Sequence, residues 1–356
     1  MKAGLISLGS TSSQWTLDAM KEYFDEVENL YLKDLEVSIS GKSAEILYQG
    51  KPLSNDFDAI YAKGSFRYAQ ILRSITTIMQ KHCYMPIQTE AFTVAHDKLL
   101  TQLMLQTHNI PMPKTYISSG IKSARDLLRK VNYPIVMKFP QGTQGKGVMF
   151  ADSFSSASSI LDAMSTLNQG FIVQEYIETQ NSDVRAIVIG DKVVASMIRI
   201  GKSDEKRANL HAGGSGEEYK LDYETKKIAV KASKATGADI CGVDILEGPK
   251  GPLVIETNIS PGLQGITKVS GVDVASKIAE HLYNKAKERL QTKDDKNKKE
   301  IMASVNNKGK IITSLDIRAN RIILPKLVMQ TTKFTESDQV EIEMENGKLS
   351  LNRLNL

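Results

Sequence analysis

Three oxygen-bearing side chains occur in two neighbouring segments of the last third of the chain. Asp244 lies inside one short apolar run, and Glu256 and Asn258 lie inside the next. Residues 248–252 between them, Gly-Pro-Lys-Gly-Pro, predict a tight turn that pairs the two runs as antiparallel strands. Glu256 and Asn258 are two positions apart and therefore share one face of their strand. Two carboxylates and an amide oxygen make a hard, all-oxygen set of the kind that Mg²⁺ with bound phosphates prefers.

A solvated or lysine-paired role for these acids is the alternative, because most acidic residues at strand ends have one. The neighbouring apolar residues Val243, Ile245, Val254 and Ile255 place the carboxylates beside a core. Unpaired charge is costly there unless a cation neutralises it. The metal-site interpretation therefore requires phosphate-binding residues elsewhere in the chain.

A glycine-rich segment is the candidate phosphate site. One predicted strand ends at Lys138 and another begins at Val148. The loop between them contains Gly142, Gly145 and Gly147, which let backbone N–H groups approach an anion closely. The segment lacks the GxGxxG spacing and the following helix of a dinucleotide-binding turn. A flexible hairpin turn without a ligand is the alternative.

Two arginines lie on the strands that follow. Arg185 is two residues after Asp183 and shares its face, while Arg199 closes the next predicted strand. Ion pairing with acids and binding of an anion are both open to these arginines. Residues 207–214 are polar and glycine-rich, which is typical of a mobile loop near a site.

The remaining pattern predicts the elements that position these groups. Residues 2–89 alternate strand-like and helix-like runs and predict a small α/β domain, in which 9–13 could bind an anion or form a simple turn. Apolar periodicity predicts strands 3–8, 57–61, 114–117, 171–177, 183–189 and 192–198, and helices 91–109, 121–131, 153–165, 223–236 and 272–289.

The composition limits the function classes. The 356 residues suggest two or three domains, and 41% apolar and 24% charged residues are ordinary for a globular protein. A net charge of +5 suits anionic small molecules, whereas a nucleic-acid-binding protein usually has a denser Lys/Arg stripe.

Cys83, Cys241 and the scattered histidines indicate neither a disulfide framework nor a zinc site. No signal-like or membrane-length apolar run occurs, so we expect a cytoplasmic protein without a membrane partner.

The C-terminal part differs in character. Residues 291–308 are highly charged without apolar periodicity and predict a linker. Residues 309–356 predict a small unit with strands at 310–312, 321–325 and 340–344 and a strong hairpin-turn signal at 345–348. Because so few residues bury little core alone, we expect dimerisation or docking.

Six motifs together resemble the ATP-grasp superfamily, specifically its RimK-like branch of α-L-glutamate ligases. They occur in the family's order at 142–148, 173–177, 183–185, 207–211, 242–246 and 256–263. The resemblance implies an α/β (α+β ATP-grasp) fold class. The implied parts are an N-terminal pre-ATP-grasp α/β domain at 1–90, a two-lobed ATP-grasp domain at 91–290 (flap lobe 91–175, metal-binding lobe 176–290), the linker at 291–308 and a β-rich module at 309–356.

The resemblance also implies ligands for ATP and magnesium, with manganese as an alternative ion. Lys98 and Lys138 would contact nucleotide phosphates, while Asp244, Glu256 and Asn258 would hold the metal. Other nucleotide-binding residues would lie in the flap, in the adenine-binding hinge and beside the reacting phosphate: Gly142, Gln144, Gly145 and Gly147; Gln174, Glu175 and Tyr176; and Asp183, Arg207 and Asn209.

In this family the γ-phosphoryl group of ATP is transferred to a carboxylate, and an amine then attacks the acyl phosphate, so no enzyme nucleophile is needed. The implied catalytic residues are Arg185, Arg199, Arg207 and Asn209. Of these, Arg185 and Arg199 would stabilise the acyl phosphate or bind an amino-acid carboxylate. The implied amine is L-glutamate, and the acceptor is a ribosomal protein tail, a pterin or deazaflavin cofactor, or an amino-group carrier protein. Ala212 stands where ribosomal-protein-modifying relatives tend to carry Arg, which leaves the acceptor open.

The tail, especially 321–325 through 338–342, resembles a swapped-hairpin AbrB-type module, a family that often dimerises and binds DNA. Because Lys and Glu are mixed in this tail, we expect a homo-oligomer, a dimer or tetramer, rather than nucleic-acid binding. A nucleotide-sensing regulator that binds DNA through the tail is the second hypothesis. The complete oxygen set of Asp244, Glu256 and Asn258 argues against it.

Overall fold

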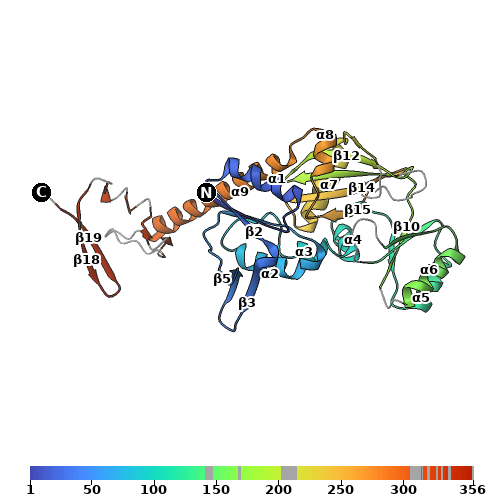
Figure 1. The fold of residues 1–356 in the computed structure, drawn as a ribbon, viewed down its shortest axis with the longest axis horizontal. Helices are drawn as coiled ribbons and strands as arrows, with labels where there is room; N and C mark the ends of the chain where they lie inside the picture. Colours follow the sequence, from blue (N-terminus) through green and yellow to red (C-terminus); the bar gives the residue numbers. More distant parts are fainter. Residues whose placement is uncertain are drawn as a thin grey trace. The chain divides into compact units, whose positions relative to one another are not determined.

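The computed structural model describes residues 1–140, 147–166, 170–201 and 215–304, with only the backbone described for 293–304, and parts of the tail: 314, 316–318, 321–325, 328–329, 332–335 and 338–354. The chain forms two compact units, Met1–Ala286 and Lys287–Leu356. Figure 1 follows the chain through both. The finer domain boundaries expected from the sequence stay predictions.

A parallel sheet forms the centre of the N-terminal domain (residues 1–90), for which the sequence predicted alternating strands and helices but no strand direction. Its elements are β1 (Lys2–Ser7), α1 (Thr11–Tyr23), β2 (Glu26–Tyr31), the 3₁₀ helix η1 (Leu32–Asp34), β3 (Leu35–Ile39), β4 (Ala44–Tyr48), β5 (Lys51–Pro52), β6 (Ala59–Ala62), the 3₁₀ helix η2 (Phe66–Tyr68) and α2 (Ala69–Met79). Strand β1 lies between β2 and β6, and β3, β4 and β5 form a separate antiparallel sheet. The sequence does not predict β2 or this second sheet, because exposed polar residues interrupt their apolar runs.

A helical break corrects one prediction. The expected helix 91–109 is two helices, α3 (Ala91–Val94) and α4 (Lys98–Thr107). The break arises because Asp97 adopts an extended backbone and its carboxylate accepts from the N–H groups of Leu99 and Leu100, which caps α4. Lys98 consequently begins α4, and its N–H donates to the carbonyl of Pro140 at 2.9 Å. This bond ties the start of α4 to the end of the strand that precedes the glycine-rich loop.

Within the flap lobe predicted at 91–175, residues 115–175 have a hydrophobic core of their own. Its elements are β7 (Thr115–Ile117), α5 (Ile121–Leu128), β8 (Ile135–Lys138), β9 (Val148–Ala151), α6 (Phe154–Thr166) and β10 (Ile172–Glu175). The sheet order is β7–β10–β8–β9, and Leu128 of α5, Leu161 of α6 and Met137 of β8 are buried in one cluster. The strand end at Lys138 and the new strand at Val148 are confirmed.

The large-sheet lobe (residues 182–286) carries the predicted oxygen set. Its elements are β11 (Ser182–Ile189), β12 (Lys192–Ile200), β13 (Ser215–Glu218), α7 (Tyr223–Thr236), β14 (Ile240–Gly248), β15 (Gly251–Asn258), α8 (Gln264–Ser270) and the first part of α9 (Val274–Ser304). The antiparallel order is β13–β12–β11–β14–β15, so the predicted pairing of β14 with β15 is confirmed. One hydrophobic core joins this lobe to the N-terminal domain.

The predicted linker begins within a helix, because α9 continues to Ser304. Residues 291–304 contain no Gly or Pro and many good helix formers, so a helix forms without an apolar stripe. The tail contains β16 (Asp316–Arg318), β17 (Arg321–Ile323), β18 (Val340–Glu345) and β19 (Lys348–Arg353). The turn predicted at 345–348 joins β18 to β19, with Gly347 at φ +77°, whereas the predicted strand 310–312 lies outside the described residues.

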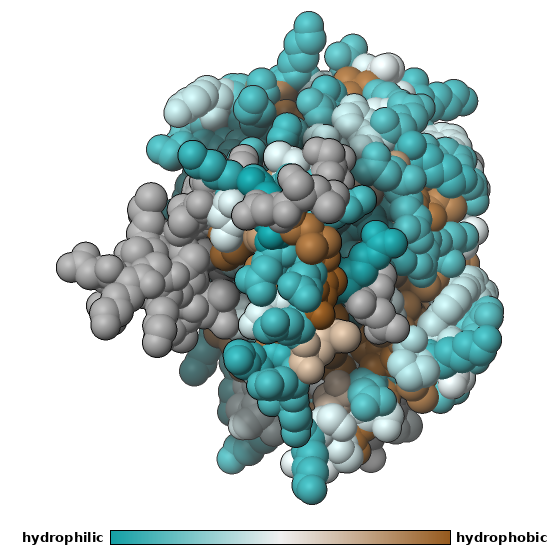
Figure 2. All heavy atoms as spheres, turned by 90° about the vertical axis from the view of Figure 1, so that its left-hand side faces the viewer, coloured by the Kyte–Doolittle hydropathy of each residue, from teal (hydrophilic) through white to brown (hydrophobic). Residues whose placement is uncertain are grey.

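The surface is mixed in character. Polar side chains cover most of the face drawn in Figure 2, with hydrophobic ones in smaller groups between them. In the described part of 287–356 no hydrophobic side chain is buried, while Ile342, Met344 and Leu349 are exposed. None of the helices in the described ranges has the length and apolar character needed to cross a membrane.

Candidate active site

One cavity of about 790 Å³ is lined by side chains from the N-terminal domain, the flap lobe and the large-sheet lobe. Of the sequence-predicted site residues that the structure describes, all but Gly147 line it: Lys98, Lys138, Gln174, Glu175, Tyr176, Asp183, Arg185, Arg199, Asp244, Glu256 and Asn258. Motifs that are far apart in the sequence therefore meet at one site.

The flap contributes only part of its predicted residues. Gly142, Gln144 and Gly145 lie outside the described residues, as do Arg207, Asn209 and Ala212. Gly147 has φ +77°, and a Cβ built there would lie 2.7 Å from Cδ2 of Phe139. Position 147 therefore requires glycine for the close approach of the flap backbone to Phe139.

A short chain of hydrogen bonds fixes Lys138 at the end of β8. Its Nζ donates to Oε1 of Gln174 at 2.6 Å, and Nε2 of Gln174 donates to the hydroxyl of Thr115 at 2.9 Å. The surrounding protein lowers the pKa of Lys138 to about 8 through desolvation, which the negative charge of Glu256 partly opposes. This arrangement leaves a pre-positioned cation that a phosphate group would stabilise in its charged form.

The link between the flap and large-sheet lobes begins at Glu175. Its N–H donates to the carbonyl of Lys114 at 2.9 Å, and its Oε1 accepts from the N–H of Lys114 at 2.7 Å. The ring of Tyr176 packs edge-on against Phe150 with centroids 6.0 Å apart. A flat, partly apolar wall of this kind suits a heteroaromatic base.

Several cavity residues were missed by sequence reasoning. Val136, Phe150, Leu246 and Ile255 supply apolar wall next to the predicted hinge, and Lys63 and His96 supply nitrogen atoms. The four apolar residues lie on strands already predicted, so strand alternation around Lys138 and Asp244 could have pointed to some of them. Lys63 has no such signal.

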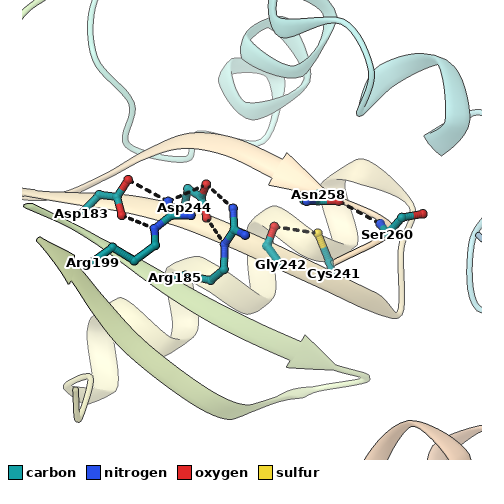
Figure 3. Close-up of polar contacts among 8 residues, drawn as sticks. All are labelled: Asp183, Arg185, Arg199, Cys241, Gly242, Asp244, Asn258 and Ser260. Atoms are coloured by element: carbon teal, nitrogen blue, oxygen red, sulfur yellow. Dashed lines mark hydrogen bonds and ion pairs between the residues drawn. The ribbon is translucent and has the colours of Figure 1, made fainter. Parts of the chain in front are cut away.

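Two aspartates and two arginines form an ion-pair network on one face of the large sheet (Figure 3). Arg185 lies opposite Asp244, and Asp183 lies opposite Arg199, in the strand register. Arg199 donates to both oxygens of Asp183, at 2.5 and 2.7 Å, and its Nη2 lies 2.9 Å from Oδ2 of Asp244. The sequence leaves both ion pairing and anion binding open for these arginines. Their described contacts are ion pairs with Asp183 and Asp244.

The network separates the two aspartates electrostatically. Burial alone would raise the pKa of Asp244, but Arg185 and Arg199 hold it well below its usual range. Burial raises the pKa of Asp183 to about 6, against the attraction of Arg199 and with added repulsion from Asp244. On acidification Asp183 would therefore take up a proton before Asp244 does.

The predicted metal ligands are adjacent but not equivalent. Asp244 lies directly opposite Glu256, and Asn258 is two residues further along β15. Asp244 is occupied by the two arginines, whereas no hydrogen bond or ion pair joins Glu256 to another described residue. Asn258 Oδ1 accepts from the N–H of Ser260 at 2.9 Å and keeps a second lone pair.

These donors fit magnesium in part. Within the described ranges, no group of three or more His, Cys, Asp or Glu side chains is arranged to hold a metal. Mg²⁺ commonly takes one or two carboxylates and completes its shell with phosphate and water oxygens. Glu256 and Asn258 match that requirement, while Asp244 would first have to release a guanidinium group.

Comparisons with known proteins agree with this geometry. The family model of the RimK-like ATP-grasp domain matches residues 95–282. A probable alpha-L-glutamate ligase of Vibrio cholerae is 36% identical over 302 residues, covering 82% of this chain and 99% of the relative. A probable alpha-L-glutamate ligase of Legionella pneumophila is 37% identical over 257 residues, covering 70% and 84%.

Solved structures share the fold. The ATP-grasp ligase PsnB, complexed with minimal precursor, Mg and ADP, superposes with a TM-score of 0.63 at 17% identity over 80% of this chain and 98% of that one. A RimK domain ATP-grasp protein from Sphaerobacter thermophilus gives 0.61 at 18% identity, over 79% and 99%. The predicted fold class is thereby confirmed. The chain belongs to the RimK-like ATP-grasp family of ligases.

Proposed function

We propose that this ATP-grasp ligase activates an acceptor carboxylate with ATP and joins it to the amino group of L-glutamate, with release of ADP and phosphate. The relatives named as probable alpha-L-glutamate ligases support the choice of amino acid. The observation that carries the proposal is the single cavity in which Lys138 of the flap lobe and Glu256 of the large-sheet lobe are both wall residues.

The nucleotide would lie between the two lobes. Lys98 and Lys138 would bind its phosphates, with Lys138 held by Gln174, and the backbone near Glu175 and Tyr176 would bind adenine. Asp183, Arg207, Asn209 and the flap residues Gly142, Gln144, Gly145 and Gly147 are proposed as further nucleotide ligands. Binding of the phosphates would offset the desolvation that lowers the pKa of Lys138, because an adjacent anion favours the charged amine.

Glu256 and Asn258 are proposed as the protein ligands of Mg²⁺, or of Mn²⁺, with Asp244 as a third ligand once an arginine is released. Bound ATP supplies the phosphoryl group that converts the acceptor carboxylate into an acyl phosphate, and the metal neutralises charge on that group. The remaining catalytic work is positioning and charge stabilisation by the side chains of the cavity.

Arg185 and Arg199 are proposed to stabilise the developing charge beside the metal. Both already donate into the cluster around Asp244, so they are held on the cavity wall before any substrate arrives. Pre-positioned donors in a water-poor site stabilise a transition state without reorganisation at the moment of reaction.

The direct test is an acceptor screen with ATP, Mg²⁺ and L-glutamate. The acceptors are a peptide from a ribosomal protein tail, a pterin or deazaflavin that already bears glutamate, and an amino-group carrier protein. We expect ADP release only when both organic substrates are present, together with a mass increase of one or more glutamate residues on one acceptor. If no acceptor leads to ADP release, and the chain shows salt-sensitive DNA binding that survives Glu256→Gln, the result would instead support a DNA-binding regulator.

We also propose that the tail joins two or more copies of this chain. In the register of the β18–β19 hairpin, Ile342 faces Leu351 and Met344 faces Leu349, so these four apolar side chains share one face. Because Ile342, Met344 and Leu349 are exposed, this face is available for burial against a second copy. A dimer or tetramer is the expected assembly.

A further inference from the structure

Lys63 is a buried amine at the wall of the cavity. Only 5% of its surface is exposed, and its Nζ has no hydrogen-bond partner among the described residues. Desolvation lowers the pKa of Lys63 to about 8, and no carboxylate contributes to that shift. A buried amine without a counter-charge is unfavourable for folding, so its position at a cavity wall points to an anionic ligand.

The fold fixes where Lys63 lies. It follows β6 directly, and its N–H donates to the carbonyl of Ile6 on β1 at 2.9 Å. The next residue, Gly64, packs so closely that a Cβ there would lie 2.9 Å from Leu32 and from Leu72. The N–H of Gly64 donates to the hydroxyl of Ser260 at 3.0 Å, two residues beyond Asn258. Through its neighbour Gly64, Lys63 is therefore held next to the loop that follows the proposed metal ligands.

A helix N-terminus lies at the same edge of the parallel sheet. Strands β1 and β6 run in the same direction, so α1, which follows β1, begins beside the residue that follows β6. Ser10 caps α1, and both Ser10 and Ser13 line the cavity with Lys63. The first turn of a helix carries partial positive charge and unpaired N–H groups, which favour an anion.

The other cations of the described cavity wall already have assignments. Arg185 and Arg199 pair with Asp244 and Asp183, and Lys98 and Lys138 are proposed for the nucleotide phosphates. An amino acid with two carboxylates brings negative charge that none of these four would neutralise. Lys63 is the remaining lysine or arginine on the described wall.

We propose that Lys63 and the N-terminus of α1 bind a carboxylate of the incoming amino acid and so orient its amine toward the activated acceptor. This inference rests on the proposed ligase function. It gives Lys63 the role of selecting the amine substrate. The ligand class is an amino acid with an acidic side chain. The acceptor carboxylate is assigned to the metal side of the cavity instead.

The test compares Lys63→Met with wild type in steady-state ligase assays. Loss of a charged hydrogen bond should raise KM for L-glutamate about 10- to 100-fold. KM for ATP and for the acceptor should stay within about twofold, as should all constants in Lys33→Met, which removes an exposed lysine of the same domain. Lys63→Arg, which keeps the charge, should recover part of the affinity.

Calorimetric titration of L-glutamate in the presence of Mg²⁺ and a non-hydrolysable ATP analogue gives a second readout that needs no acceptor. The dissociation constant should rise in Lys63→Met by the same factor as KM. L-glutamine and the α-amide of glutamate serve as competing probes. The amide whose binding is insensitive to Lys63→Met identifies the carboxylate that Lys63 contacts.

Unchanged glutamate binding in a folded, active Lys63→Met would overturn the inference and leave the ligase function intact. A rise in KM for the acceptor alone, or an equal rise for ATP, would also overturn it. If wild type neither binds L-glutamate nor transfers it, the proposed function fails first, and this inference falls with it.

Discussion

Both carboxylate oxygens of Asp244 accept from Arg185, at 2.7 Å from Nε and 2.7 Å from Nη2. Arg199 approaches the same carboxylate at 2.9 Å. Asp244 is therefore neutralised by the protein itself, and Glu256, directly across on β15, is the carboxylate with coordination positions to offer a metal. The two acids of the predicted oxygen set therefore differ in how many of their oxygens are already engaged by the protein.

The first prediction concerns Glu256. Glu256→Gln keeps the shape of the side chain and removes the charge that a metal requires, so ADP release should fall about 100-fold or more at fixed Mg²⁺. Glu247→Gln on neighbouring β14, where the carboxylate accepts from the hydroxyl of Tyr219, is the matched control and should retain activity. Activity titrated over a range of Mg²⁺ concentrations measures the effect. A Glu256→Gln enzyme with normal magnesium dependence would rule this ligand out.

The second prediction concerns stability of the ion-pair network. Asp244→Asn leaves the buried guanidinium group of Arg199 and the partly buried one of Arg185 with less counter-charge, which should lower the free energy of unfolding by about 3 kcal/mol. Asp162→Asn breaks the exposed pair with Arg125, whose atoms lie 2.6 Å apart, and should cost under about 1 kcal/mol. Urea unfolding measures both. Equal losses would show that burial does not set the strength of the Asp244 network.

The third prediction concerns the pH dependence caused by Lys63. Its pKa is lowered to about 8 in the folded chain from 10.5, so the unfolded chain binds more protons between these pH values. The free energy of unfolding should therefore rise with pH over that range, by about 3 kcal/mol from this group. Lys63→Met should be more stable than wild type at pH 7, and the difference should narrow as pH approaches 10.5. A difference for Lys63→Met that does not change with pH would contradict the prediction.

The fourth prediction concerns the tail hairpin. The double change Met344→Lys and Leu349→Lys places two charges opposite each other on the apolar face, so oligomers should dissociate to monomers in sedimentation velocity. Glu343→Lys with Ser350→Lys alters the paired positions on the other face and should leave the assembly intact. Association that survives the first pair would place the interface elsewhere.

Local patterns predicted much of the site. An antiparallel strand pair was predicted from the apolar runs around Asp244 and Glu256 and from the turn between them. The two residues lie opposite each other in that pair. The helix break at Asp97 was missed, because apolar periodicity continues across it while the capping carboxylate decides the geometry. Lys63 was missed for another reason. Its environment depends on contacts such as Gly64 with Ser260, 196 positions apart, and no spacing in the sequence records them.

The hydrophobic interior has a consequence for turnover. The buried hydrophobic residues form two separate cores. One core contains residues between Ala3 and Ile110 and between Val184 and Ala286, and the other contains residues between Ala124 and Val173. The proposed nucleotide site would thus lie at the boundary between the flap lobe and the rest of residues 1–286, two parts with separate hydrophobic cores. If this boundary widened, neither core would be exposed to water, so we expect the flap lobe to move when ADP is exchanged for ATP.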